Sequence, residues 1–134
     1  MMMLKDVKDY IKTLQIAEYV YMGKMPDKQD KAIGVYHSKH EHEYQTALGG
    51  EDLRSYGVKY VTLLIHWNKS PGETEAAALR VQEALRRTRE ASVNQEKIKF
   101  IHTLYDIQDV GTDEAGIYEM VIEAAVVYEK GKGD

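Results

Sequence analysis

Apolar and polar positions along the chain follow two different periods, and the longer period predicts two helices. From Leu4 to Leu14 the apolar side chains recur every three or four residues, with charged side chains between them. A second helix is predicted from Ser70 to about Ala91. It opens on the sequence SPGE, in which a serine cap, a first-turn proline and a glutamate suit the unpaired amides of a helix start.

The shorter period, in which every second side chain is apolar, predicts strands. The strongest of them, Val58–Trp67, is apolar in both alternating sets, which predicts a central strand that is buried on both faces. Two shorter β-rich segments, Glu18–Met22 and Ala32–His37, come earlier in the chain with a turn between them. They predict two strands joined by that turn.

Two further segments, Lys97–Tyr105 and Ile117–Glu129, alternate clearly and are separated by turn-forming residues. In the first segment the alternation places Ile98, Phe100 and His102 on one face. In the second it makes one face fully apolar. We expect the two strands to pair as a hairpin.

The order of these elements is α-β-β-loop-β-α-β-β, which predicts an α+β fold. We expect a mostly antiparallel sheet of four to five strands with two packed helices, in a single domain over residues 1–134. The polar segment from Ser38 to Tyr56 is predicted to be a long surface loop, and residues 130–134 are predicted to be a frayed tail.

Composition excludes several classes of protein. The chain has no cysteine, which removes disulfides, thiolate metal sites and cysteine nucleophiles. Its formal net charge is −4, and the basic residues cluster only at Arg86, Arg87 and Arg89, so tight DNA binding is not expected. The longest apolar run, Ala124 to Tyr128, is too short to span a membrane, and the first residues do not resemble a secretory signal. We expect a protein that stays in the cytoplasm of the cell that makes it.

One cluster has the residue types of a metal site, namely His37, His40 and His42 in the sequence HSKHEHE. A metal site needs rigidly held ligands, whereas this cluster lies where a strand enters the predicted loop. A solvated polar loop is the simpler interpretation, and a small metal-dependent enzyme remains the alternative. His66 and His102 lie within strands, where a hydrogen-bonded structural histidine is expected. No nucleophile elbow, phosphate loop or dinucleotide-binding motif is present in the sequence.

Three segments, in order along the chain, resemble the minor capsid or tail-completion (tail terminator) proteins of tailed phages and prophages of Gram-positive bacteria. YGVKYVTLLIHWNKSPGETEAAALRVQEALRRT, Tyr56 to Thr88, is similar to that family's central strand, short turn and Ala-rich helix. VGTDEAGIYEMVIEAAVVYE, Val110 to Glu129, is similar to its closing hairpin strand. YMGKMPDKQDKAIGVYHS, Tyr21 to Ser38, is similar to its entry into the second strand. The loop with His40 and His42 has no counterpart in the family pattern.

The resemblance implies a structural subunit of the virion, without catalysis or a cofactor, that is assembled in the cytoplasm of the bacterial host. Such a subunit would form a ring of identical copies, expected to be a hexamer, which caps the tail tube protein and joins it to the head connector proteins. A head-completion or connector subunit that contacts the portal is the alternative within the same class.

The charge of the chain also bears on a ring of this kind. Genomic DNA that passes through an acidic ring would be repelled by the wall and would bind no part of it specifically. Glu119 and Glu123, which lie opposite the apolar face of the last strand, are the candidate channel-facing residues. About six copies would carry a formal charge of about −24, so net charge alone predicts that salt promotes assembly.

Overall fold

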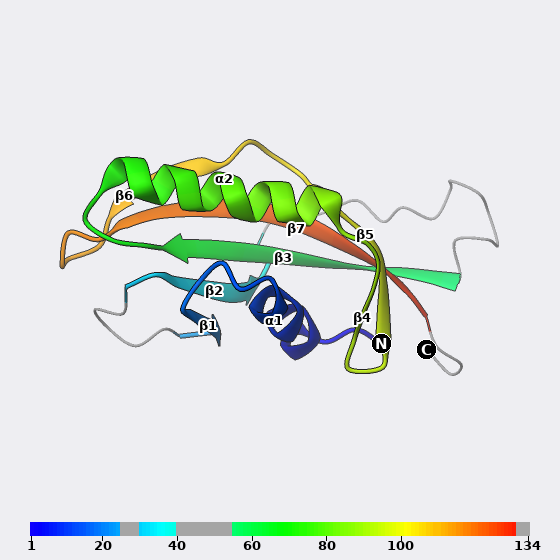
Figure 1. Cartoon of the computed structure of the whole chain (residues 1–134). Helices are drawn as coiled ribbons and strands as arrows, with labels where there is room; N and C mark the ends of the chain where they lie inside the picture. The colour runs from blue at the N-terminus through cyan, green and yellow to red at the C-terminus, as the bar shows by residue number, and fades with distance from the viewer. Residues whose placement is uncertain (25–29, 40–54, 131–134) are drawn as a thin grey trace.

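The computed structural model describes residues 1–24, 30–39 and 55–130. Figure 1 shows the helices and strands that these residues form. The two helices are α1 (Leu4–Thr13) and α2 (Pro71–Arg87). The strands are β1 (Tyr19–Met22), β2 (Ala32–His37), β3 (Tyr56–His66), β4 (Arg89–Val93), β5 (Glu96–Thr103), β6 (Gln108–Thr112) and β7 (Tyr118–Glu129).

All of these strands belong to one sheet, in the order β1-β2-β3-β7-β5-β4, with β6 also paired to β7. The α+β class and the predominance of antiparallel pairs are confirmed. The expected number of four to five strands is wrong, because β4 and β6 were not predicted. The first two strands pair with one another in parallel.

The predicted pairing of β5 with β7 is confirmed, but no single turn joins the two strands. Strand β6 lies between them in the chain, and it is β6 that forms the hairpin with β7. β6 pairs with the first residues of β7, and β5 pairs with the last ones. The long strand β7 therefore holds two different partners along the same edge.

Strand β5 does not keep the expected alternation along its whole length. Its register with β7 shifts between Ile98 and Phe100, so the side chains on the two sides of the shift no longer share a face. Ile98 and Ile101 are buried, whereas Phe100 is 42% exposed. The prediction that Phe100 and Ile98 lie together on one apolar face is therefore wrong, and the bulge is the reason.

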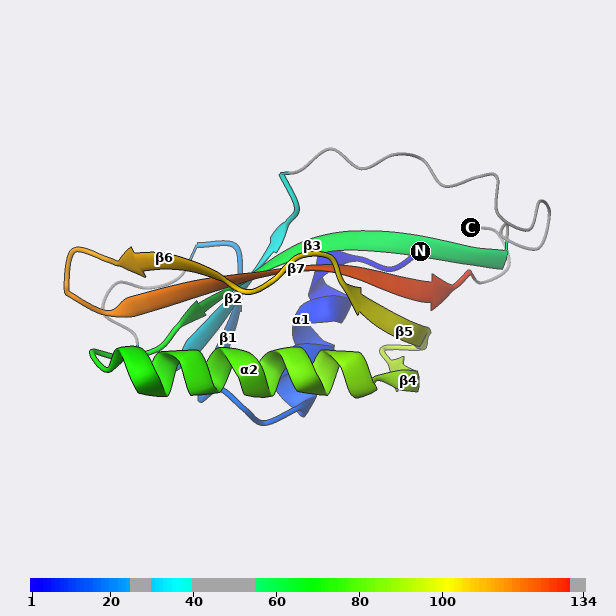
Figure 2. The ribbon, with the colours of Figure 1, turned by 90° about the horizontal axis from the view of Figure 1, so that it is seen from above.

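Both helices pack on the same face of the sheet, as the view in Figure 2 shows. Helix α1 lies against β1 and β2, and α2 lies against β5, β7 and β3. Buried apolar side chains from both helices join those of the sheet in one core, which includes Ile11, Leu63, Leu85 and Ile122. Burial of these side chains is the main force that holds the two layers together.

Helix α2 begins as its sequence predicts. The Ser70 hydroxyl accepts a hydrogen bond from the backbone N–H of Glu73 at 3.2 Å, and Pro71 occupies the first helical position. The helix ends at Arg87, four residues before the expected end, because Thr88 has an extended backbone. The Thr88 hydroxyl lies 2.8 Å from the Tyr10 hydroxyl of α1, so the end of α2 is held by a residue that is distant in sequence.

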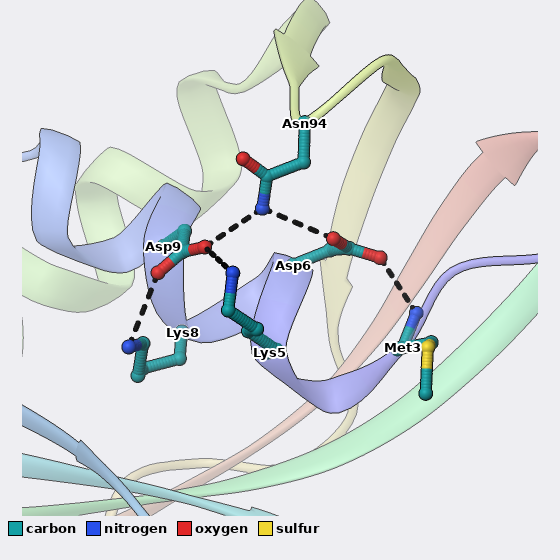
Figure 3. Close-up of polar contacts among 6 residues, drawn as sticks. All are labelled: Met3, Lys5, Asp6, Lys8, Asp9 and Asn94. Carbon is teal, nitrogen blue, oxygen red and sulfur yellow. Dashed lines mark hydrogen bonds and ion pairs between the residues drawn. The ribbon is translucent and has the colours of Figure 1, made fainter.

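A polar contact ties α1 to the turn between β4 and β5 (Figure 3). The side-chain amide of Asn94 donates hydrogen bonds to Asp6 at 3.0 Å and to Asp9 at 2.7 Å. The ammonium groups of Lys5 and Lys8 also lie within 3.3 Å of Asp9. The pKa of Asp9 is lowered to about 2, mainly by the hydrogen bond from Asn94. Asn94 therefore joins the turn between β4 and β5 to two residues of α1.

The junction between β3 and α2 is built around Trp67, the one tryptophan of the sequence. Its side chain is only 4% exposed, and the guanidinium of Arg80 lies 5.8 Å from the ring centroid. Its backbone N–H donates to Tyr118, and its carbonyl accepts from Lys31. The residue therefore links the end of β3 to both neighbouring parts of the sheet.

Candidate assembly surface

The second face of the sheet is covered by neither helix, and it presents a mixed apolar and polar surface. Two residues of β3 and β7 that are paired in register lie on the same face of the sheet. Because side chains alternate along a strand, every second pair lies on this second face. We call it the open face. From these two strands it receives Tyr56, Val58, Tyr60, Thr62, Leu64, His66, Glu119, Val121, Glu123, Ala125, Val127 and Glu129.

The open face has apolar side chains that are partly accessible to water. Val58 is 42% exposed, and Phe100, which lies opposite Val127 in register, is equally exposed. The ring of Tyr56 lies below the ammonium of Lys99, 5.7 Å from it. Accessible apolar groups with polar neighbours are typical of surfaces that meet another protein.

At one end of the open face, His66 and Asp113 form a closely packed polar pair. The Nε2 atom of His66 lies 2.8 Å from Oδ2 of Asp113. The other carboxylate oxygen of Asp113 accepts hydrogen bonds from the backbone N–H groups of Ala115 and Ile117, both at 2.9 Å. These contacts lower the pKa of Asp113, and the hydrogen bond with His66 is the largest cause. The pair thereby fixes the turn between β6 and β7 to the end of β3.

Sequence reasoning found half of this arrangement. His66 is a hydrogen-bonded structural histidine, as expected. The role of Asp113 in shaping its turn follows from the residue types around it. Its pairing with His66 was missed, because the two residues are 47 positions apart and nothing in the local sequence connects them. His102, in contrast, is exposed on the open face, opposite Ala125.

The two glutamates that were predicted to face a channel lie in different surroundings. Glu119 is half-buried opposite His66. Burial is the largest influence and raises the pKa of its carboxyl group, His66 lowers it and Asp113 raises it, so the net shift is upward. The carboxylate also contributes to a raised pKa of Tyr36, for which burial is the larger cause. A half-buried acid at this position would still present negative charge to anything that approaches the open face.

Glu123 is only 4% exposed, and its carboxylate accepts a hydrogen bond from the hydroxyl of Thr62 at 2.8 Å. Its charge is thus enclosed by protein and is not presented to water. The interpretation of Glu123 as a channel-facing residue does not fit this burial, and Glu119 remains the candidate.

Of the three histidines of the predicted cluster, one lies within the described residues. His37 is exposed at the end of β2, and His40 and His42 lie outside the described residues. Within residues 1–24, 30–39 and 55–130, no group of three or more histidine and acidic side chains is placed to hold a metal ion. Across the same part of the chain, no helix is long and apolar enough to cross a membrane.

Comparison with known proteins gives the family. None of the curated proteins matches the chain significantly. The model of one protein family, described as bacteriophage tail terminator protein, matches residues 6–130. This range begins within α1 and ends one residue after β7, so it includes the sheet, its open face and almost all of the helix-covered core. The chain therefore belongs to the bacteriophage tail terminator family, which is a family of structural phage tail proteins.

Proposed function

We propose that this protein is the subunit of a ring that caps the phage tail tube and joins it to the head connector. The family match over residues 6–130 supports the assignment to the end of the tail. The observation that carries the ring is the end of the open face near Val58 and Phe100, since accessible apolar side chains gain stability when another protein covers them.

The proposed role needs contacts and a passage, and it needs no reaction. A ring of identical subunits presents the same surface to every copy of the tube protein below it. Its channel must let DNA through without retaining it, which an acidic wall would favour. Glu119 is our candidate for such a wall, because it is a partly accessible carboxylate on the open face.

Imaging of phage particles that lack this protein tests the role. We expect normal heads and tails of irregular length, since an uncapped tube has no defined end, and we expect the purified protein to restore uniform, joined particles. Filled heads without tails, or empty heads, would instead assign the protein to the head connector. Normal, infectious particles would contradict both structural roles.

The metal-dependent alternative can be tested in the same preparation. Protein purified without a polyhistidine tag is assayed for bound metal beside a variant with His37, His40 and His42 changed to alanine. We expect both proteins to contain no stoichiometric metal and to complement equally. Metal that is bound by the unaltered protein and lost together with complementation in the variant would favour the alternative.

A further inference from the structure

We propose that neighbouring copies of this chain contact one another end to end, with an acidic patch on one copy against a basic patch on the next. The inference rests on the ring proposed above, and it names the two surfaces that would close it. The occupant of each patch is therefore a second copy of the same chain.

The acidic patch consists of Asp109 and Val110 in β6 and Glu114 in the turn that follows, all of which are exposed. Val110 is 49% exposed. The surrounding segment, Leu104 to Glu129, contains no lysine or arginine. Its acidic residues are Asp106, Asp109, Asp113, Glu114, Glu119, Glu123 and Glu129. Of these, Glu123 is buried and Glu129 lies at the other end of β7, so the negative charge at this end of the molecule comes from the other five acidic residues.

The basic patch consists of Arg86 in the last turn of α2, Arg89 in β4 and Phe100 in β5. Arg89 and Phe100 lie opposite one another in register, and all three side chains are exposed. Arg86 donates to the hydroxyl of Thr103, and Arg89 donates to backbone carbonyl oxygens, including that of Thr88. Among the described residues neither arginine has a carboxylate partner, so both charges are available to another molecule.

The lysines next to the basic patch do not cancel its charge. Lys97 and Lys99 both pair with the same carboxylate, that of Glu90, at 3.1 and 2.6 Å. One carboxylate neutralises one of the two ammonium groups at most. Glu129 lies opposite Lys97 in register and also acts on Lys99, so the two lysines are balanced by two carboxylates and the net charge of the patch is that of the two arginines.

The two patches lie at opposite ends of the ribbon formed by β3 and β7 (Figure 1). Asp109 of the acidic patch is paired with Met120 near the start of β7, and Phe100 of the basic patch is paired with Val127 near its end. At about 3.3 Å per residue, seven residues of strand separate the patches by about 23 Å. Contacts between unlike patches at opposite ends of a subunit are the kind that closes a ring.

Each patch combines charge with an exposed apolar side chain, which is the composition of a protein interface with an apolar centre and a polar rim. Arginine is well suited to this role, because its planar guanidinium can bind a carboxylate through two parallel hydrogen bonds. DNA is a less suitable occupant of the basic patch, since the chain as a whole is acidic and Glu90 lies beside it. The complement of each patch is found on the chain itself.

Segregation of the charges reverses the expected effect of salt. Net charge alone predicts that screening relieves repulsion and promotes assembly. If unlike patches meet, screening weakens the attraction between them, so assembly should be strongest at low ionic strength. The sign of the salt effect thus separates end-to-end contact from other ways of forming a ring.

Two charge variants test the contact directly. Asp109→Asn with Glu114→Lys alters the acidic patch, and the asparagine keeps an acceptor for the backbone N–H of Gly111. Arg86→Glu with Arg89→Gln alters the basic patch. Matched controls make the same net charge changes at exposed positions elsewhere. These are Glu18→Lys with Asp30→Asn, and Lys12→Glu with Lys24→Gln.

Analytical ultracentrifugation and native mass spectrometry of the full chain, alone and with isolated tail tubes, give the readout. We expect each patch variant to remain folded and to need a concentration about tenfold higher for assembly, with the controls unchanged. Mixing the two patch variants should restore rings in which they alternate. Every second contact then joins two unaltered patches, and the others join the Glu114→Lys patch with the Arg86→Glu patch, whose introduced charges are again opposite.

The outcomes separate the contact from the function it rests on. Rings that form equally well from both patch variants, or that grow with salt, would overturn the end-to-end contact and leave the ring in place. Patch variants that fail to assemble and are not rescued by mixing would also overturn it. A protein that stays monomeric at every concentration, even beside tail tubes, would overturn the ring itself and the contact with it.

Discussion

Gly57 is a position in β3 where the fold leaves no room for a side chain. It lies opposite Tyr128 of β7, and a Cβ atom placed on it would overlap the tyrosine ring. Tyr128 is buried in the core, so its ring is not free to move aside. An aromatic ring that covers a strand glycine in this way excludes water from the backbone.

Gly57→Ala should therefore destabilise the protein by about 1 to 3 kcal/mol, as overpacking of a closed site does. Urea denaturation followed by circular dichroism measures the change. Gly72→Ala is the control, since a Cβ there meets nothing within 4 Å. An unchanged midpoint for Gly57→Ala would mean that Tyr128 does not lie over this residue.

Asp113 links the protonation of one carboxyl group to the stability of the fold. Its pKa is lowered in the folded protein, chiefly by His66, so folding favours its charged form. The resulting stability is present above the ordinary carboxyl pKa of about 3.9 and is lost as pH falls through the lower pKa of the folded state.

Asp113→Asn should remove this contribution while it keeps an acceptor for the turn. We expect the variant to be less stable at pH 6, and the difference from the unaltered protein to shrink as pH falls below about 4. Free energies of unfolding at a series of pH values give the comparison, with Asp106→Asn as an exposed control. A difference that stays constant down to the lowest pH would contradict the assigned linkage.

Among the elements, α2 shows how much a local pattern can predict. Its first proline and apolar stripe lie within 17 residues and its cap directly precedes them, so its start could be placed from the sequence. Its end could not, because the Tyr10 contact at Thr88 comes from the other helix. The helix formers after Arg87 extend the pattern, but tertiary contacts direct these residues into β4.

Strand β6 was missed for a related reason. Most of its side chains are exposed, so its sequence does not alternate, and only the pairing with β7 makes it a strand. The surroundings of two residues on the open face could not be predicted from local sequence either. Burial of Glu123 and the partner of His66 both depend on the register of strands, which a single sequence does not provide.

The contribution of the Ser70 cap to the stability of α2 can be tested by substitution. Ser70→Ala removes the acceptor for the N–H of Glu73 and should cost about 1 kcal/mol. Ser70→Asp, which also caps well, should restore the stability. Denaturant midpoints of the three proteins measure it, and equal midpoints for serine and alanine would show that the cap contributes nothing.

Asn94 supports two elements at once, and two variants separate its roles. Its backbone has a φ of 49°, which glycine adopts easily, and its side chain bonds Asp6 and Asp9 of α1. Asn94→Gly should lose only the side-chain bonds, at about 1 kcal/mol, whereas Asn94→Ala should add about 1 to 2 kcal/mol of backbone strain.

Chemical denaturation ranks these two variants against the unaltered protein. NMR titration provides a second readout, because the pKa of Asp9 should rise from about 2 when the donor is removed. If Asn94→Gly left both the stability and the pKa unchanged, the link between α1 and the β4–β5 turn would have no energetic role.

For the whole molecule, the two glutamates of β7 should behave differently although their sequence pattern is the same. Glu119→Lys changes a half-buried charge on the open face, so we expect a folded protein that retains duplex DNA more strongly at low salt. Glu123→Lys places an unlike charge in an enclosed site, which should cost about 3 to 5 kcal/mol.

DNA retention on a filter and thermal unfolding give the two measurements. Exposed Glu75→Lys on α2 is the charge-matched control. A Glu119→Lys protein that retains no more DNA than this control would remove Glu119 from the channel wall. A Glu123→Lys protein of normal stability would show that its site is open to water.

The fluorescence of the buried tryptophan between β3 and α2 can report whether the protein is folded. Trp67 is enclosed beside Arg80, so its fluorescence should shift to longer wavelength when α2 leaves the sheet. The patches proposed to join neighbouring copies do not include it, so assembly should leave that emission unchanged while light scattering rises. In one cuvette and without a dye, the two signals would distinguish a subunit that has lost its fold from one that has only lost its neighbours.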